Sequence, residues 1–114
     1  MKPETIRTTT NPEIIRVYDA VPQLKRLRSE VLLDDVWLQP ELAYRDRILV
    51  TIGVLAAGGR FVEMQQWMRR SMEEAGITLD ELRGLVTQVA LYAGWPAGLC
   101  AGRAGLDLFE AGSK

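Results

Sequence analysis

The stretch GGRFVEMQQW, at residues 58–67, holds the side chains with the clearest chemical potential. In a helix, residues three and four positions apart are neighbours, so Arg60, Glu63 and Trp67 would share one stripe. A carboxylate can transfer a proton, and a guanidinium can stabilise a developing anion. An indole adds a flat apolar surface and one N–H donor. Such a stripe is typical either of the wall of a small-molecule site or of the edge of a packed helix.

The amino-acid composition argues against several classes of function. The chain of 114 residues has a formal net charge of −1, which argues against a nucleic-acid binder, and 47% hydrophobic residues, enough for the core of a single domain. It has no histidine and a single cysteine, Cys100. A zinc or iron site would then depend on carboxylates, which these metals seldom accept alone. We therefore expect no metal site.

Hydropathy indicates where the chain resides. No window approaches 18 consecutive apolar residues, so we expect no membrane span. The first residues, MKPETIRTTTNPE, lack the apolar segment of a signal peptide. These features predict a cytoplasmic protein that binds neither membrane nor nucleic acid.

Helix signals cover most of the chain, and no strand pattern is found. Residues 1–11 are polar and read as a loose arm, and residues 12–112 as one domain. The clearest signals are Asn11 before Pro12, Gly76 as a C-terminal cap, and a capping box of Thr78 and Glu81. The sequence predicts an all-α fold of about six helices, over residues 12–20, 23–33, 43–57, 61–74, 79–93 and 96–109.

Two predicted helices have unusual surfaces. Residues 43–57 are apolar nearly all round after the first turn, which is typical of a helix buried in a bundle. The last helix region has glycines at positions 94, 98 and 102, and interior glycines cost about 1 kcal/mol each relative to alanine. We expect another helix to come very close there, within the subunit or across an oligomer interface.

Several motifs together resemble the carboxymuconolactone decarboxylase family, within the alkylhydroperoxidase D-like superfamily. They are VWLQPEL, RDRILVTIGVLAAGGRFVEMQQW and QVALYAGWPAG, and the resemblance covers residues 36–109. It implies an all-α fold with a central helical hairpin, assembled as a homo-oligomer, commonly a trimer or hexamer.

The resemblance can be tested against the superfamily's peroxide chemistry, which uses a glutamate, two cysteines and a histidine. Those roles fall on Ile48, Arg60, Glu63 and Trp67, and none matches. A thiol peroxidase needs a reactive thiolate and a second thiol to resolve it. The sequence therefore predicts that the protein is not a thiol peroxidase.

The family's other chemistry is the cofactor-free decarboxylation of a lactone acid. Where the family has Glu-Leu-x-x-His, this chain has EMQQW, which keeps the carboxylate as Glu63 and replaces the histidine with Trp67. The family's arginine before the buried helix is retained as Arg47. The resemblance implies Glu63 and Arg47 as catalytic residues and no cofactor.

Other positions are candidates for substrate binding, and each also has a structural explanation. Gln39 stands where the family has arginine, and Cys100 where it has asparagine. Glu63 could equally form an ion pair with Arg60 or Arg47, and Trp67 could be packing. The candidate substrate-binding residues are Trp67, Tyr44, Arg60, Gln39, Cys100 and Trp95.

Three functions of different class follow. The first is a cofactor-independent lyase, isomerase or cyclase that acts by decarboxylation or proton transfer on a cyclic or aromatic organic acid or ketone. The second is a non-catalytic ligand-binding protein of the family. The third is a structural oligomer in which Glu63 and Arg47 form an interface ion pair.

Overall fold

A computed structural model describes residues 11–112, which fall into two compact units divided between Tyr44 and Arg45. The units are described separately below. Apart from Asn11, the predicted arm of residues 1–11 lies outside the described residues. The single domain over residues 12–112 stays a prediction.

The first unit begins with helix α2, Pro12–Ala20, which has the expected N-terminal cap. Asn11 Oδ1 accepts hydrogen bonds from the backbone N–H groups of Glu13, at 2.9 Å, and Ile14, at 3.4 Å. Pro12 occupies the first helical position, where its missing N–H costs nothing. The local sequence therefore accounts for where this helix starts.

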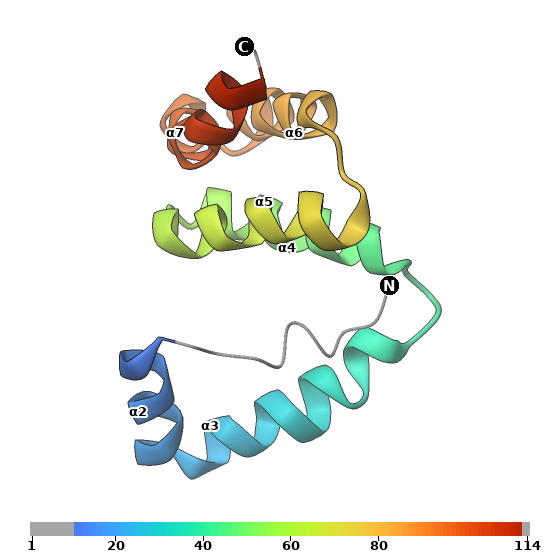
Figure 1. The fold of residues 1–114 in the computed structure, drawn as a ribbon, viewed down its shortest axis with the longest axis vertical. Helices are drawn as coiled ribbons and strands as arrows, with labels where there is room; N and C mark the ends of the chain where they lie inside the picture. Colours follow the sequence, from blue (N-terminus) through green and yellow to red (C-terminus); the bar gives the residue numbers. More distant parts are fainter. Residues whose placement is uncertain (1–10, 113–114) are drawn as a thin grey trace. The chain divides into compact units, whose positions relative to one another are not determined.

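The second predicted helix, over residues 23–33, is present but changes its geometry. Helix α3, Pro22–Arg26, continues directly into a π-helical segment, η1, Leu27–Leu33 (Figure 1). A short 3-10 helix, η2, Val36–Leu38, follows. The π-helical turn was not predicted from the sequence.

The second unit is built from four long helices, and the predicted all-α class is confirmed. Residues 11–112 contain six α-helices and no strand. Within this unit α7 contacts both α5 and α6, and α6 and α7 lie side by side (Figure 1). The four helices are α4, Tyr44–Ala57, whose first residue is the last of the first unit; α5, Phe61–Ala75; α6, Leu79–Tyr92; and α7, Trp95–Gly112.

Caps and turns between these helices follow the sequence closely. Gly76 ends α5 in the left-handed conformation, with φ of 67°, which residues other than glycine rarely adopt. Thr78 and Glu81 form the predicted capping box at the start of α6. The α5–α6 connection is therefore fixed at both ends by local interactions.

The core of the second unit is lined by apolar residues at helical spacing. Ile48 and Ile52 on α4 are fully buried, as are Met64 and Met68 on α5. The prediction that α4 is buried on all sides is wrong, however, because Val50 and Val54 are exposed on its other face. Apolar periodicity alone did not show which face of this helix the rest of the unit covers.

Gly98 is the glycine of the repeat that the close approach of α6 and α7 requires. A Cβ atom on Gly98 would lie 2.4 Å from the Ala90 Cβ and 2.8 Å from the Ala90 Cα. Real carbon atoms do not approach so closely, so only glycine lets α7 lie this near α6. The predicted close approach of two helices is confirmed, and it occurs within the subunit.

Gly98→Ala should destabilise the protein, by about 1–3 kcal/mol, because its methyl group would meet the α6 backbone. The matched control is Gly84→Ala on α6, where an added Cβ would meet nothing within 4 Å. That control should be neutral or stabilising by up to about 1 kcal/mol, through helix propensity. Thermal and urea unfolding of both variants measure the difference. Equal stability of the two would contradict this account of the α6–α7 contact.

Candidate active site on helix α5

Glu63 lies in the first turn of α5, with its side chain exposed. A carboxylate is favoured at this end because the helix dipole is positive there. Within residues 11–112 the side chain has no hydrogen-bonding or ion-pairing partner. A structural ion pair between Glu63 and Arg60 or Arg47 is therefore not formed within the described part of one chain. The carboxylate is open to a ligand.

Arg60 lies just before α5, so it is not part of the helical stripe that was predicted to hold Arg60, Glu63 and Trp67. It occupies the N-cap position with non-helical φ and ψ of −88° and 76°. Its side chain folds back over the α4–α5 turn, since a Cβ on Gly58 would lie 3.6 Å from Arg60 Cγ and 3.7 Å from Nε. Arg60 and Glu63 are thus near in sequence, but no ion pair joins them.

Trp67 has a cationic neighbour that the sequence interpretation missed. The guanidinium carbon of Arg70 lies 5.2 Å from the centroid of the Trp67 ring, a cation–π arrangement. Arg70 Nε also lies 3.7 Å from Glu74 Oε1. The spacing of three residues between Trp67 and Arg70 could have indicated this contact. Trp67 therefore presents an indole with a guanidinium over the ring, in place of a purely apolar platform.

Arg47 lies in the first turn of α4 and is partly buried. Its backbone carbonyl accepts a hydrogen bond from Thr51 Oγ1 at 2.8 Å, one turn later. No hydrogen bond or ion pair joins Arg47 to Glu63 within the described residues. A role for the two side chains in one site therefore stays a prediction.

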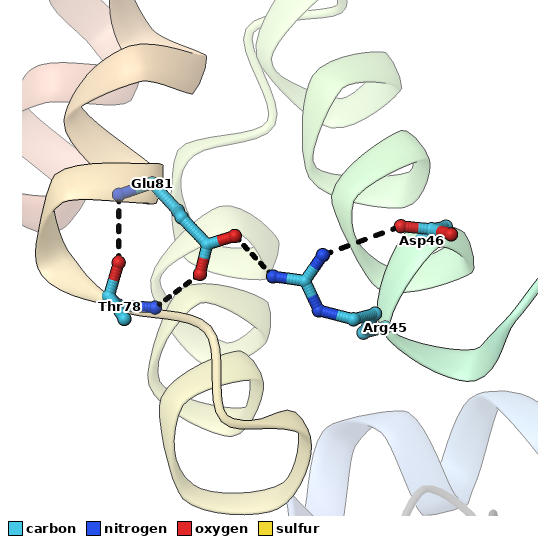
Figure 2. A network of polar contacts seen from close by, with 4 residues as sticks. All are labelled: Arg45, Asp46, Thr78 and Glu81. Atoms are coloured by element: carbon cyan, nitrogen blue, oxygen red, sulfur yellow. Dashed lines mark hydrogen bonds and ion pairs between the residues drawn. The ribbon is translucent and has the colours of Figure 1, made fainter.

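Arg45, two residues earlier, is held in a polar network that connects α4 to α6 (Figure 2). Its Nη2 donates a hydrogen bond to Glu81 Oε2, while Nη1 lies 3.6 Å from Asp46 Oδ1. The other Glu81 oxygen accepts from the Thr78 backbone N–H at 3.0 Å, and Thr78 Oγ1 accepts from the Glu81 N–H at 3.1 Å. The Glu81 carboxylate thus completes the N-terminal cap of α6 and also binds Arg45 on α4.

The network changes the protonation of Glu81. The hydrogen bond from Arg45 lowers the pKa of the Glu81 carboxyl below its ordinary value, and the hydrogen bond from the Thr78 backbone lowers it further. The same hydrogen bond raises the pKa of Arg45. Both groups stay charged near neutral pH, so the pair acts as a structural ion pair between α4 and α6.

Gln39 and Tyr44 belong to the first unit, where local contacts hold both. Gln39 Nε2 donates a hydrogen bond to Asp35 Oδ1 at 2.6 Å. The ring of Tyr44 lies 5.7 Å from that of the buried Trp37, in an edge-on arrangement. Their assignment to substrate binding stays a prediction.

A separate apolar groove of about 710 Å³ runs between α6 and α7. Trp95 is the one predicted site residue that lines it, and Cys100, which is partly buried on α7, does not. Glu63, Arg47 and Trp67 do not line it either. The groove is lined by Arg83, Val86, Thr87, Ala90, Leu91, Trp95, Gly98, Leu99, Gly102, Arg103, Leu106 and Phe109.

Across residues 11–112, no group of three histidine, cysteine or carboxylate side chains could hold a metal ion. In the same range, no helix has the length and apolar character to cross a membrane.

Comparison with known proteins matches residues 22–105 to the carboxymuconolactone decarboxylase family. The 4-carboxymuconolactone decarboxylase of Acinetobacter baylyi is 40% identical over 76 residues, which are 67% of this chain and 56% of that protein. An uncharacterized protein of Methanocaldococcus jannaschii is 33% identical over 66 residues, 58% of this chain and 64% of the relative. The chain thus spans about three fifths of the length of these curated relatives. No solved structure matches it significantly.

The Arg45–Glu81 ion pair predicts a specific pH dependence of stability. Because folding lowers the pKa of Glu81, the pair stabilises the fold above the ordinary value of 4.5. That stabilisation is lost as the pH falls through the lower pKa of the folded state. Glu81→Gln should therefore lower the melting temperature at pH 7, and its difference from the wild type should shrink towards about pH 3.

Glu73→Gln is the matched control, because Glu73 is an exposed carboxylate on α5 with no partner among residues 11–112. Its melting temperature should follow that of the wild type at every pH. A constant difference between Glu81→Gln and the wild type from pH 7 to about pH 3 would contradict the assignment.

Proposed function

Since the chain belongs to the carboxymuconolactone decarboxylase family, we propose that it is a cofactor-independent enzyme that acts by decarboxylation or proton transfer. The substrate is a small cyclic or aromatic organic acid or ketone. The observation that carries the proposal is Glu63, an exposed carboxylate without a partner in the described chain, at the position where the family helix has its glutamate.

The proposed reaction follows from the two candidate catalytic side chains. When a carboxylate β to a carbonyl group leaves as CO₂, the electrons of the broken C–C bond move towards that carbonyl and form an enolate. The guanidinium of Arg47 stabilises that negative charge. Glu63, in its protonated form, then donates a proton to the enolate carbon. For an isomerisation, Glu63 as a carboxylate first removes a proton from carbon and later returns it.

Trp67 and Arg70 support a change of substrate relative to the family. An indole cannot shuttle a proton, because its N–H only donates a hydrogen bond, so Trp67 cannot replace the histidine in chemistry. An aromatic ring with a guanidinium 5.2 Å from its centroid suits a flat substrate that carries a carboxylate. In the proposal, Trp67 and Arg70 bind the substrate while Glu63 transfers the proton.

The alternative is a ligand-binding or structural protein that has lost catalysis. The contacts of Arg70 with Trp67 and with Glu74 favour it, since these side chains already engage one another on α5 where the family has its histidine. Homo-oligomeric assembly and a cytoplasmic location are part of either proposal.

Glu63→Gln should lower the turnover number by roughly 10²–10⁴-fold, because an amide keeps the shape of the side chain but cannot transfer the proton. CO₂ release and uptake of solvent deuterium into product measure it, with 4-carboxymuconolactone and related cyclic acids as probes. Glu73→Gln on the same helix is the matched control and should retain full turnover. Unchanged turnover of Glu63→Gln would remove this residue from the mechanism.

The variant Trp67→His distinguishes an active enzyme with a changed substrate from a protein that has lost catalysis. The substitution supplies an imidazole that titrates near neutral pH, one turn along α5 from Glu63. If the remaining site is competent, it should raise the rate of CO₂ release from 4-carboxymuconolactone at least about 100-fold, the lower end of the contribution of a general acid or base. If neither the wild type nor Trp67→His turns over any probe, the non-catalytic alternative is favoured.

A further inference from the structure

The first turn of α4 within the second unit is the part of that helix that the apolar core does not hold. The buried residues of α4 are Ile48, Ile52 and Ala56, which lie four residues apart on one face and begin only after the first turn. The residues at positions 45–47 are only partly buried. A helix turn that lacks a buried apolar side chain opens more easily than the rest of the helix.

The side chain of Arg45 ties this turn to the start of α6 (Figure 2). Its Nη2 donates a hydrogen bond to Glu81 Oε2. The acceptor is itself held in place, because the other Glu81 oxygen accepts from the Thr78 backbone N–H and the Glu81 N–H donates to Thr78 Oγ1. Arg45 is thus bound to a carboxylate whose position the cap of α6 determines.

The exposure of this ion pair indicates that its effect is mainly geometric. The side chains of Arg45 and Glu81 are 41% and 39% exposed. Ion pairs so open to water add only modestly to stability, because the solvent screens the charges. The pair can nevertheless decide how α4 is rotated about its own axis, since it fixes one side of the helix to α6.

Arg47 belongs to the same turn and is affected by that rotation. Each residue of an α-helix is turned by about 100° from the one before it, so Arg47 lies about 200° around α4 from Arg45. A rotation of the turn that moves Arg45 away from Glu81 would also redirect the Arg47 side chain. A displacement of about 1 Å in a group that acts on the substrate can cost about 100-fold in rate.

We propose that Arg45 and Glu81 are positioning residues, which fix the first turn of α4 and thereby direct the Arg47 guanidinium towards the substrate. The inference rests on the proposed function, in which Arg47 stabilises the enolate. Neither Arg45 nor Glu81 contacts the substrate in this scheme. Their loss should therefore lower kcat and leave KM nearly unchanged.

The kinetic test is a double-mutant cycle of Arg45→Met with Arg47→Met, measured as CO₂ release from 4-carboxymuconolactone. Arg45→Met alone should lower kcat roughly 10–100-fold and change KM by less than about threefold. In the Arg47→Met background it should lower kcat by less than about twofold, because the residue through which it acts is gone. Glu81→Gln should lower kcat as Arg45→Met does, although glutamine still serves in the capping box.

Amide hydrogen exchange on the same variants tests the anchoring without any substrate. The N–H groups of residues 48–50 bond to carbonyls of residues 44–46 in an α-helix. In Arg45→Met and Glu81→Gln they should exchange roughly tenfold faster than in the wild type, while those of residues 52–56 keep their protection. Arg26→Met is the matched control, because it removes an exposed ion pair with Glu30 in the first unit and should change neither exchange in α4 nor turnover.

The two measurements separate failure of this inference from failure of the proposed function. Unchanged exchange of residues 48–50 would overturn the inference, as would an equal loss of kcat from Arg45→Met with and without Arg47. If the wild type turns over no probe while the exchange responds, the proposed function and the catalytic consequence of the pair are overturned, and the anchoring of α4 to α6 is supported. Circular dichroism checks that each variant keeps its helices.

Discussion

The close approach of α6 and α7 at Gly98 and Ala90 is the contact on which the second unit depends. With 2.4 Å between a hypothetical Cβ on Gly98 and that of Ala90, no larger residue fits at position 98 without a shift of the α6 backbone. Because α7 also contacts α5, the position of α7 affects the helix that carries the candidate site. Gly98 also lines the groove between α6 and α7.

Helix α5 combines a buried apolar face with an exposed carboxylate. Met64 and Met68 are buried and hold the helix in the core, while Glu63 remains exposed in its first turn. In a chain with no histidine, proton transfer near neutral pH would depend on a carboxylate. In the proposed function, Trp67 and Arg70 bind the substrate and do not act as a second proton donor.

Local signals in the sequence predicted most of the fold, because caps depend on residues two to four positions apart. Asn11, Gly76 and Thr78 each end or begin a helix as expected. The ion pair of Arg45 with Glu81 joins residues 36 positions apart, so no local pattern reveals it. The exposed face of α4 also depends on tertiary packing. It stays a prediction that Glu63 and Arg47 belong to one site.

The most direct test of the central claim is an experimental structure of the assembled protein with a bound cyclic carboxylic acid. The account predicts that the Glu63 carboxylate, the Arg47 guanidinium and the Trp67 indole face one cavity, with the ligand within hydrogen-bonding distance of Glu63. A structure in which Glu63 faces bulk solvent with no cavity beside it, or is sealed in an ion pair at a subunit interface, would contradict it.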